Sequence, residues 1–204
     1  MSFRDALQHY LDYSDDTHVL YLDEHAVIIK DLFPKASRHY LVLPRKYTHE
    51  HPLKVFKSHP EFYDTVFQKV EKAKELLIES LVREGIVENS DTSREEFSHT
   101  QIQVGIHLKP SLRNLHIHII TKDFYSPRLK NKKHYNSFTT TFFVPFDQLD
   151  PKQINTPPED PEAVLKKDMH CINCGKNFSN KFSALKVHLE AEYKANFGKK
   201  FVDS

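Results

Sequence analysis

Residues 114–124 read NLHIHIITKDF, a run of β-branched residues that carries two histidines two positions apart. This alternation predicts a strand. Because successive side chains of a strand leave on opposite faces, His116 and His118 are expected to project together, with the isoleucines beside them on the other face. A neutral imidazole offers one nitrogen lone pair to a proton, a metal or an electrophilic phosphorus. The pair therefore suits a metal site, a catalytic site or an ordinary polar sheet face.

A second strand is predicted at residues 100–107, where polar and apolar residues alternate through TQIQVGIH. Residues 108–114 form a short connection, so the two strands are expected to fold back on each other as a hairpin. His107, at the end of the first strand, can then lie near His116. Three imidazoles gathered in this way favour a functional site over a polar sheet face.

The remaining pattern predicts an α+β fold, an antiparallel sheet with helices packed against it. Apolar residues spaced three and four apart predict an amphipathic helix at the N-terminus, starting at Phe3, and a longer helix over residues 60–83. Residues 84–97 are mostly polar and are predicted to form a loop. Further strands are predicted at residues 18–23, 26–31, 38–44 and 139–146.

Composition bounds the class of protein. The 204 residues are 39% hydrophobic and 12% aromatic, which is enough for one sizeable core and a small appendage. No apolar run reaches about 18 residues and no signal peptide is evident, so no membrane association is expected. The formal charge is +1, so a polyanion must bind through a local patch. Residues 128–134 supply a basic patch, although such a run is also typical of a solvated surface.

Cys171 and Cys174 are the only cysteines and are separated by two residues. They follow residues 150–168, which hold four prolines and few large apolar residues and are predicted to be a linker. Two cysteines at this spacing bind metal or perform redox chemistry more often than they form a structural disulfide. His188 lies beyond thirteen intervening residues, and Glu192 one helical turn later on the same face.

This spacing favours a zinc finger. Two thiolates, one imidazole and one carboxylate give the four ligands of a structural zinc site, with Glu190 as an alternative to Glu192. So short a segment cannot bury enough apolar surface to fold alone, and metal ligation supplies the missing folding free energy. Three apolar residues form its expected core: Phe178, Phe182 and Leu185. The predicted parts are a catalytic domain at residues 1–149, a linker at 150–168 and a finger at 169–204.

The sequence resembles the histidine-triad superfamily, whose signature is His-φ-His-φ-His-φ-φ with φ apolar, and within it the aprataxin family, above all its fungal type. The resemblance spans residues 3–197 and rests on DLFPKASRHYLVLPR, GIHLKPS, NLHIHIITKDFYSPRLKNKKHYNSF and the metal-binding tail. Asn114 departs from the signature, because it replaces the first histidine. Its backbone carbonyl, which in the family accepts a hydrogen bond from the nucleophilic histidine, is retained. The forkhead-associated domain of vertebrate aprataxins has no counterpart here, so recruitment through it is not expected.

The resemblance implies a histidine-triad fold and a DNA-repair deadenylase, which removes 5′-AMP from adenylated DNA ends left by abortive ligation. His116 is then the nucleophile that forms a covalent adenylyl-histidine, while His118 and His107 contact the phosphoryl oxygens and the leaving group. The resemblance implies one structural zinc in the finger and no metal at the catalytic histidine.

Binding residues are implied as well. The nucleotide contacts are Asp31 at the ribose, Leu32 at the adenine, Lys35 at a phosphate, and Asn114 and Ser111. The DNA contacts are Phe3, Tyr125, Ser126, Lys130, Lys132, Lys133 and His134. Phe3 is implied to stack on the terminal base pair beside the lesion; packing in the core with Leu7 and Leu11 is the alternative. For Asp31 and Lys35 the alternative is an ordinary turn.

The implied partner is double-stranded DNA with nicked or 5′-adenylated ends, and the implied product is AMP. The protein is expected to be a nuclear monomer, with the cytoplasm as a further location. Two other functions share part of the pattern. A generic histidine-triad nucleotide hydrolase or phosphoramidase needs neither the finger nor the basic segment, and a nucleic-acid-binding finger protein leaves the histidine strand idle. Division of labour between the two parts predicts that loss of zinc weakens DNA binding but spares a small adenylated substrate.

Overall fold

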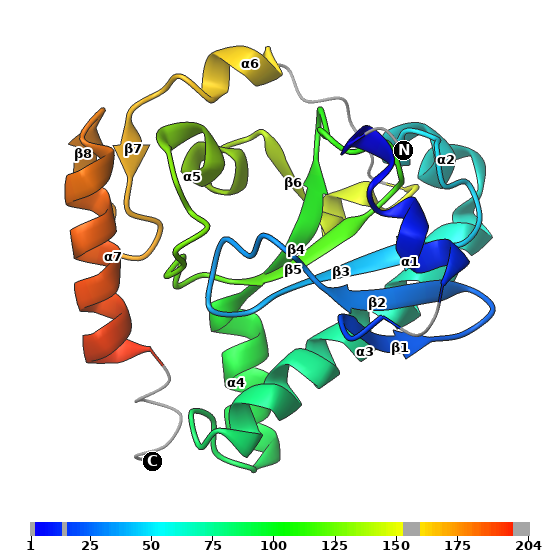
Figure 1. Ribbon diagram of the computed structural model, residues 1–204, viewed down its shortest axis with the longest axis horizontal. Helices are drawn as coiled ribbons and strands as arrows, with labels where there is room; N and C mark the ends of the chain where they lie inside the picture. Colours follow the sequence, from blue (N-terminus) through cyan, green and yellow to red (C-terminus); the bar gives the residue numbers. More distant parts are fainter. Residues whose placement is uncertain (1–2, 14–15, 153–159, 198–204) are drawn as a thin grey trace.

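The computed structural model describes residues 3–13, 16–152 and 160–197, and a six-stranded sheet forms its centre (Figure 1). The strand order is β1-β2-β3-β5-β4-β6, and each neighbouring pair is antiparallel. The strands are β1 (Val19–Leu22), β2 (Ala26–Lys30), β3 (His39–Pro44), β4 (Ile102–His107), β5 (Ile117–Thr121) and β6 (Phe143–Pro145). The predicted α+β class and hairpin are confirmed.

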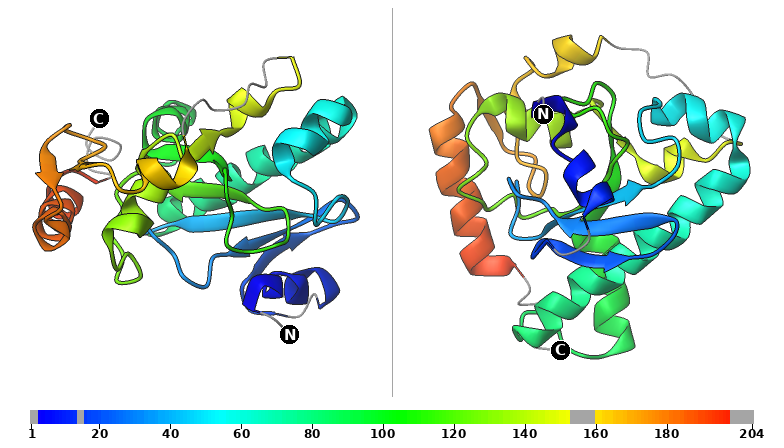
Figure 2. Two further views of the ribbon diagram at one scale, coloured as in Figure 1. Left: turned by 90° about the horizontal axis from the view of Figure 1, so that it is seen from above. Right: turned by 45° about the vertical axis from the view of Figure 1, so that its right-hand side comes forward.

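Helices cover both faces of this sheet, with α1 on one side and α2 on the other (Figure 2, left). The helical elements before the finger are η1 (Phe3–Asp5), α1 (Gln8–Asp12), α2 (Pro52–Ser58), α3 (Pro60–Arg83), α4 (Asp91–Gln101), α5 (Lys132–Thr139), η2 (Phe146–Leu149) and α6 (Pro161–Val164). The bounds of α3 match the predicted helix, because its apolar stripe is regular and Pro60 suits a first helical turn. In the described part of the chain, no helix is long and apolar enough to cross a membrane.

The two faces of the sheet bury different clusters. On one face, Ile117 and Ile119 of β5 pack with α3 in the main core. On the other face, Leu41 of β3 packs with Leu7 and Tyr10 beside α1. Helix α5 covers the rest of this second face. His116, just before β5, and His118 of β5 alternate with the core isoleucines, so they lie on the second face.

The prediction of a loop over residues 84–97 is wrong, because its whole second half, residues 91–97, belongs to α4. Ser90 caps this helix by accepting the backbone N–H of Ser93 at 3.2 Å. Phe97 is fully buried in the main core and anchors the helix. A polar helix held by one cap and one large apolar residue carries too weak an apolar period for a sequence pattern to reveal.

Strand β6 lies very close to β4 at Gly105. A Cβ atom at Gly105 would lie 2.2 Å from the Val144 carbonyl oxygen, so only glycine fits this position. The same pairing places Phe143 opposite His107. The glycine therefore helps to fix His107 beside His118 of β5.

The finger consists of a short hairpin, β7 (Met169–His170) and β8 (Asn177–Ser179), followed by helix α7 (Phe182–Asn196). Of its expected core residues, Phe178 and Leu185 are buried and Phe182 is partly buried. Gly175 adopts φ +73° in the turn after Cys174, a conformation that favours glycine. The hairpin and helix are arranged as expected for a small zinc-binding unit.

The finger packs against the rest of the molecule through α5 (Figure 1). Leu185 and Met169 belong to the same buried cluster as Tyr135 and Phe138 of α5. The end of the predicted linker is also structured, because Val164 and Leu165 are buried against Phe142. Residues 153–159 of that linker lie outside the described residues. The finger and the sheet thus share apolar core.

Candidate active site and metal centre

His116 is buried and held in a defined orientation. Its Nδ1 lies 2.7 Å from the backbone carbonyl oxygen of Asn114, which can only accept, so Nδ1 carries the hydrogen and Nε2 keeps its lone pair. Burial lowers the pKa of His116, opposed by this hydrogen bond and by the charge of Asp31. The ring is therefore neutral at neutral pH and presents one free nitrogen. The expected hydrogen bond to the carbonyl of Asn114 is present.

His118 belongs to a buried chain of hydrogen bonds. Its Nδ1 lies 2.9 Å from Nε2 of His39, and Nδ1 of His39 lies 3.2 Å from a carboxylate oxygen of Asp31. Nδ1 of His39 also accepts the backbone N–H of Lys35 at 3.3 Å, so both ring nitrogens of His39 are engaged. Nε2 of His118 is buried and has no hydrogen-bond partner among the described residues. These hydrogen bonds fix the His118 ring and leave its Nε2 available to a ligand.

His107 completes the group from the neighbouring strand. Its ring centroid lies 4.6 Å from that of His118, and the ring of His116 lies 4.9 Å from His118 on the other side. The backbone of Ser137 hydrogen-bonds to His107. In the described part of the chain, Nε2 of His107 is buried without a partner. The structure therefore brings together the three histidines predicted to be catalytic.

Burial sets the charge of the histidine group. It lowers the pKa of His39 to about 4, and it lowers the pKa values of His107 and His118 well below the ordinary range. Neighbouring imidazoles and Lys35 add to the shift, because each positive charge disfavours another. Before substrate binds, the group is thus uncharged and rich in nitrogen lone pairs.

Three of the predicted nucleotide contacts, Asp31, Leu32 and Lys35, differ in their hydrogen bonds and exposure. Asp31 accepts the backbone N–H of Phe33 at 2.8 Å in addition to its contact with His39. Leu32 is 49% exposed. Lys35 is partly buried, its ammonium donates to the carbonyl of Phe33, and burial lowers its pKa.

The remaining two predicted nucleotide contacts differ in exposure. Ser111 is exposed on the connection between β4 and β5. Asn114 is buried, and its side-chain amide donates to Gln8 Oε1 at 2.8 Å. The amide thus ties this loop to α1, and the backbone carbonyl of Asn114 is the atom that reaches the histidines.

Among the predicted DNA contacts, Phe3 is 71% exposed, so the alternative of core packing does not hold for this residue. Tyr125 is exposed at one edge, and its ring stacks on Tyr193 of α7 at 4.4 Å. Ser126 is buried, and its hydroxyl donates to the carbonyl of Pro34 at 2.6 Å. The Ser126 hydroxyl is thus used within the fold.

The basic segment is partly structural as well. Lys130 and Lys133 are exposed. The ammonium of Lys132 donates to the carbonyl of Lys166 at 2.7 Å and to the side chain of Asn180, so it ties α5 to the finger. His134 is half-buried, and its Nδ1 accepts the backbone N–H of Lys130 at 3.3 Å. Two of these four predicted contacts, Lys130 and Lys133, are thus exposed.

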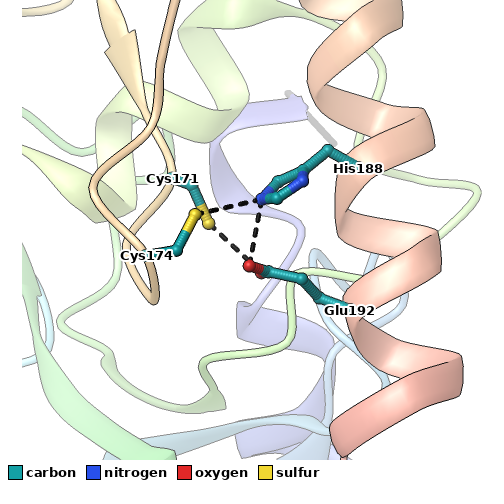
Figure 3. A group of neighbouring side chains, drawn as sticks. All are labelled: Cys171, Cys174, His188 and Glu192. Atoms are coloured by element: carbon teal, nitrogen blue, oxygen red, sulfur yellow. Dashed lines mark hydrogen bonds and ion pairs between the residues drawn. The ribbon is translucent and has the colours of Figure 1, made fainter.

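The four predicted metal ligands converge between the finger hairpin and α7 (Figure 3). His188 Nε2 lies 3.3 Å from Cys174 Sγ and 3.0 Å from a carboxylate oxygen of Glu192, and Cys171 Sγ lies 3.2 Å from the other oxygen. Ligand atoms around a tetrahedral zinc lie roughly 3.3 to 3.8 Å apart. The donor set and its spacing therefore fit zinc. Glu190, the alternative ligand, pairs instead with Lys194 at 2.6 Å.

Sequence reasoning missed His39. This residue stands on the same face of β3 as the buried Leu41 and Leu43, so a polar residue at a core position was the available signal. Its partner His118 is 79 residues away in the sequence, and only the strand pairing brings them together. His39 links Asp31 to the catalytic group.

Comparison with known proteins finds similarity along nearly the whole chain. A family model described as "Scavenger mRNA decapping enzyme C-term binding" matches residues 4–134, and one described as "C2HE / C2H2 / C2HC zinc-binding finger" matches residues 139–195. The aprataxin-like protein of Saccharomyces cerevisiae is 41% identical, covering 97% of this chain and 99% of the relative. That of Schizosaccharomyces pombe is 36% identical, covering 94% and 82%.

Solved structures agree. The crystal structure of the aprataxin ortholog Hnt3 in complex with DNA superimposes with a TM-score of 0.86 at 33% identity, over 100% of both chains. The Hnt3 structure from Schizosaccharomyces pombe gives 0.85 at 34% identity, over 100% of this chain and 98% of that one.

The fold and the histidine group define a histidine-triad hydrolase that carries a C-terminal zinc-binding finger. The chain belongs to the aprataxin family, whose activity is the removal of adenylate from DNA in repair.

Proposed function

We propose that this chain removes 5′-AMP from adenylated DNA ends left by abortive ligation, through a covalent adenylyl-histidine at His116. The observation that carries the proposal is the presentation of three Nε2 atoms. His116 offers a lone pair, and the Nε2 atoms of His107 and His118 are buried and unpaired among the described residues. Because buried polar atoms are nearly always paired, two such atoms beside a nucleophile support a ligand-binding role for this group.

The chemistry follows from these positions. Nε2 of His116 attacks the adenylate phosphorus, the N–P bond forms, and the bond from phosphorus to the DNA 5′-phosphate breaks. Water then cleaves the N–P bond, which releases AMP and restores His116. An anionic phosphate favours protonated imidazole, so His107 or His118 can donate to the phosphoryl oxygens or to the leaving phosphate once the substrate is bound. Asp31, Leu32 and Lys35 hold the nucleotide.

Metal has a structural place in this proposal. One zinc ion, held by the two cysteines, His188 and Glu192, would supply the folding free energy that the finger lacks. No metal is assigned to the histidines. Asp31, His39 and His118 lie close enough to form a ligand set, but hydrogen bonds between them occupy both nitrogens of His39 and Nδ1 of His118. The proposed site of action is the nucleus.

The proposed substrate is double-stranded DNA with a nicked or adenylated 5′ end, and the proposed product is AMP. Competition between substrates tests this. We expect nicked adenylated DNA to outcompete adenosine phosphoramidate in a single reaction, because only DNA can use the exposed basic and aromatic side chains. Preference for the phosphoramidate would indicate a generic histidine-triad hydrolase. Binding of DNA without release of AMP would indicate a nucleic-acid-binding finger protein.

Phe3 tests recognition of the DNA end. It is exposed, whereas Leu7 and Tyr10 of the same stripe are buried, so its ring is available to stack on a terminal base pair. Stacking on a base contributes roughly 1 to 3 kcal/mol, so we expect Phe3→Ala to slow deadenylation of a nicked duplex about 5- to 150-fold. Hydrolysis of adenosine phosphoramidate and the melting temperature should stay near wild type.

Tyr13→Ala is a matched control for Phe3→Ala, since Tyr13 is also an exposed aromatic, at the far end of α1. It should leave deadenylation unchanged. If Phe3→Ala instead slows both substrates alike and lowers the melting temperature by several degrees, Phe3 serves the fold, and the DNA end must be recognised elsewhere.

A further inference from the structure

A cavity of about 270 Å³ opens beside His116. Its walls come from three segments: the N-terminal turn at Arg4, residues 49–52 after β3, and residues 106–110 with 112–116. The residues that line it do not include Asp31, His39 or Lys35, the side on which the nucleotide is proposed to bind. The cavity therefore offers the nucleophile a second approach.

Backbone hydrogen bonds fix the walls to one another. The N–H of Leu115 donates to the carbonyl of Thr48 at 2.5 Å, and the N–H of Arg113 donates to the carbonyl of Arg4 at 2.7 Å. The three segments are thus joined across long sequence separations. The cavity is a built feature of the fold and not a gap between independent loops.

The lining is basic. It includes Arg4, Lys109 and Arg113 together with His49 and His51. Its single acidic member is Glu50, according to the residues that the structure describes. Arg113 pairs with Asp5 at 3.0 Å and Lys109 with Glu162 at 2.5 Å. Both cations are largely exposed to water, so these ion pairs are weak. An entering anion can replace the carboxylate that pairs with either cation.

His51 has the most defined geometry in this wall. Its Nε2 lies 3.0 Å from the carbonyl oxygen of Leu108, which can only accept, so Nε2 carries a hydrogen and Nδ1 remains for a ligand. The ring immediately precedes Pro52, the first residue of α2, which restricts the backbone there. When Nδ1 is protonated, the ring can donate to an anion in the cavity.

We propose that this cavity binds the 5′-phosphate of the DNA strand that leaves when His116 takes the adenylate, with His51 and Lys109 as its contacts. The proposal rests on the proposed function. Three observations support it: the cavity reaches His116, its lining is basic, and Arg4 follows Phe3 in the chain. A terminal base pair stacked on Phe3 would bring the 5′ end of the strand to this wall.

Equilibrium binding of reaction-product DNA tests the proposal without turnover. We expect His51→Ala and Lys109→Ala each to weaken binding of a nicked duplex with a 5′-phosphate roughly tenfold, the usual effect of losing one charge-assisted hydrogen bond. Binding of the same duplex with a 5′-hydroxyl should change little. The plot of log K against log salt for the 5′-phosphate duplex should become shallower by about one in Lys109→Ala.

Matched controls are His25→Ala, on the exposed turn between β1 and β2, and Lys57→Ala, on the exposed side of α2; neither lines the cavity. Both should bind the two duplexes as the wild type does. Equal weakening on the 5′-phosphate and 5′-hydroxyl duplexes would overturn the proposal, as would no weakening on either. If the wild type fails to release AMP from adenylated DNA, the proposed function fails, and this binding comparison still reports on the cavity separately.

Discussion

Replacing His116 by alanine should abolish release of AMP from adenylated DNA, by about 10³-fold or more, as expected for a covalent nucleophile. In the proposed mechanism the other two histidines have different roles, because His107 and His118 contact the phosphoryl oxygens and the leaving phosphate through their Nε2 atoms. Single-turnover release of AMP from a nicked adenylated duplex measures the effect directly. DNA binding by the variant should be retained, because the loss is one of chemistry.

Asn114→Ala is the informative control. It removes the amide that donates to Gln8 but keeps the backbone carbonyl that holds His116. We expect a much smaller loss of activity, because the orientation of the nucleophile depends on the carbonyl. Near wild-type release of AMP by His116→Ala would contradict the assignment of the nucleophile. A loss in Asn114→Ala as large as that in His116→Ala would show that the side chain of Asn114, and not only its carbonyl, positions the ring.

Much of the fold was predictable where local patterns are strong. Helix α3 has a regular apolar stripe, and the hairpin of β4 and β5 has clear alternation, so the sequence indicated both. The hairpin in turn placed His107 beside the other histidines. The metal ligands were predictable for a similar reason, because Cys171 and Cys174 are close in the sequence and Glu192 follows His188 by one helical turn.

What escaped prediction depends on contacts between distant segments. His39 reaches His118 only through pairing of β3 with β5. Ser126 was implied to be a DNA contact, and the hydrogen bond from its hydroxyl to Pro34, 92 residues away, has no local signature. The docking of the finger on α5 likewise has no local signature. Residues such as Leu185 were correctly expected to be buried, but the pattern could not say that they would be buried partly against another domain.

This docking joins the metal centre to the histidines. Tyr135 of α5 is fully buried, and its hydroxyl donates to the carbonyl of His170 and accepts the N–H of Ile172, both at 3.0 Å. The Tyr135 hydroxyl therefore holds the backbone on both sides of Cys171. One helical turn further along α5, Phe138 packs its ring against His118 at 5.2 Å.

Helix α5 therefore contacts both the cysteine turn and the histidines. If the cysteine turn loosens, the hydrogen bonds of Tyr135 and the shared core beneath α5 loosen with it. The ring of Phe138, which also packs against His107 at 4.6 Å, would then no longer confine the histidines. Catalytic geometry tolerates little such freedom, because small displacements of a reacting group carry large costs in rate.

Loss of the zinc should accordingly slow turnover of both DNA and small substrates. This differs from the division of labour expected from the sequence, in which only DNA binding suffers. We expect Cys174→Ser to lose its zinc by elemental analysis, to melt several degrees lower, and to hydrolyse adenosine phosphoramidate at least about tenfold more slowly, because metal ligation is a large part of the folding free energy of a finger. Lys176→Ala, an exposed change in the same turn, is the control and should alter none of these.

Tyr135→Phe separates coupling from simple unfolding. It removes only the hydroxyl that joins α5 to the cysteine turn, and it leaves all four metal ligands and the aromatic ring in the core. The variant should therefore keep its zinc and yet slow hydrolysis of both substrates, by a factor smaller than in Cys174→Ser. If zinc-free Cys174→Ser instead hydrolyses adenosine phosphoramidate at the wild-type rate, the finger acts only on DNA, and its packing against α5 has no bearing on the histidines.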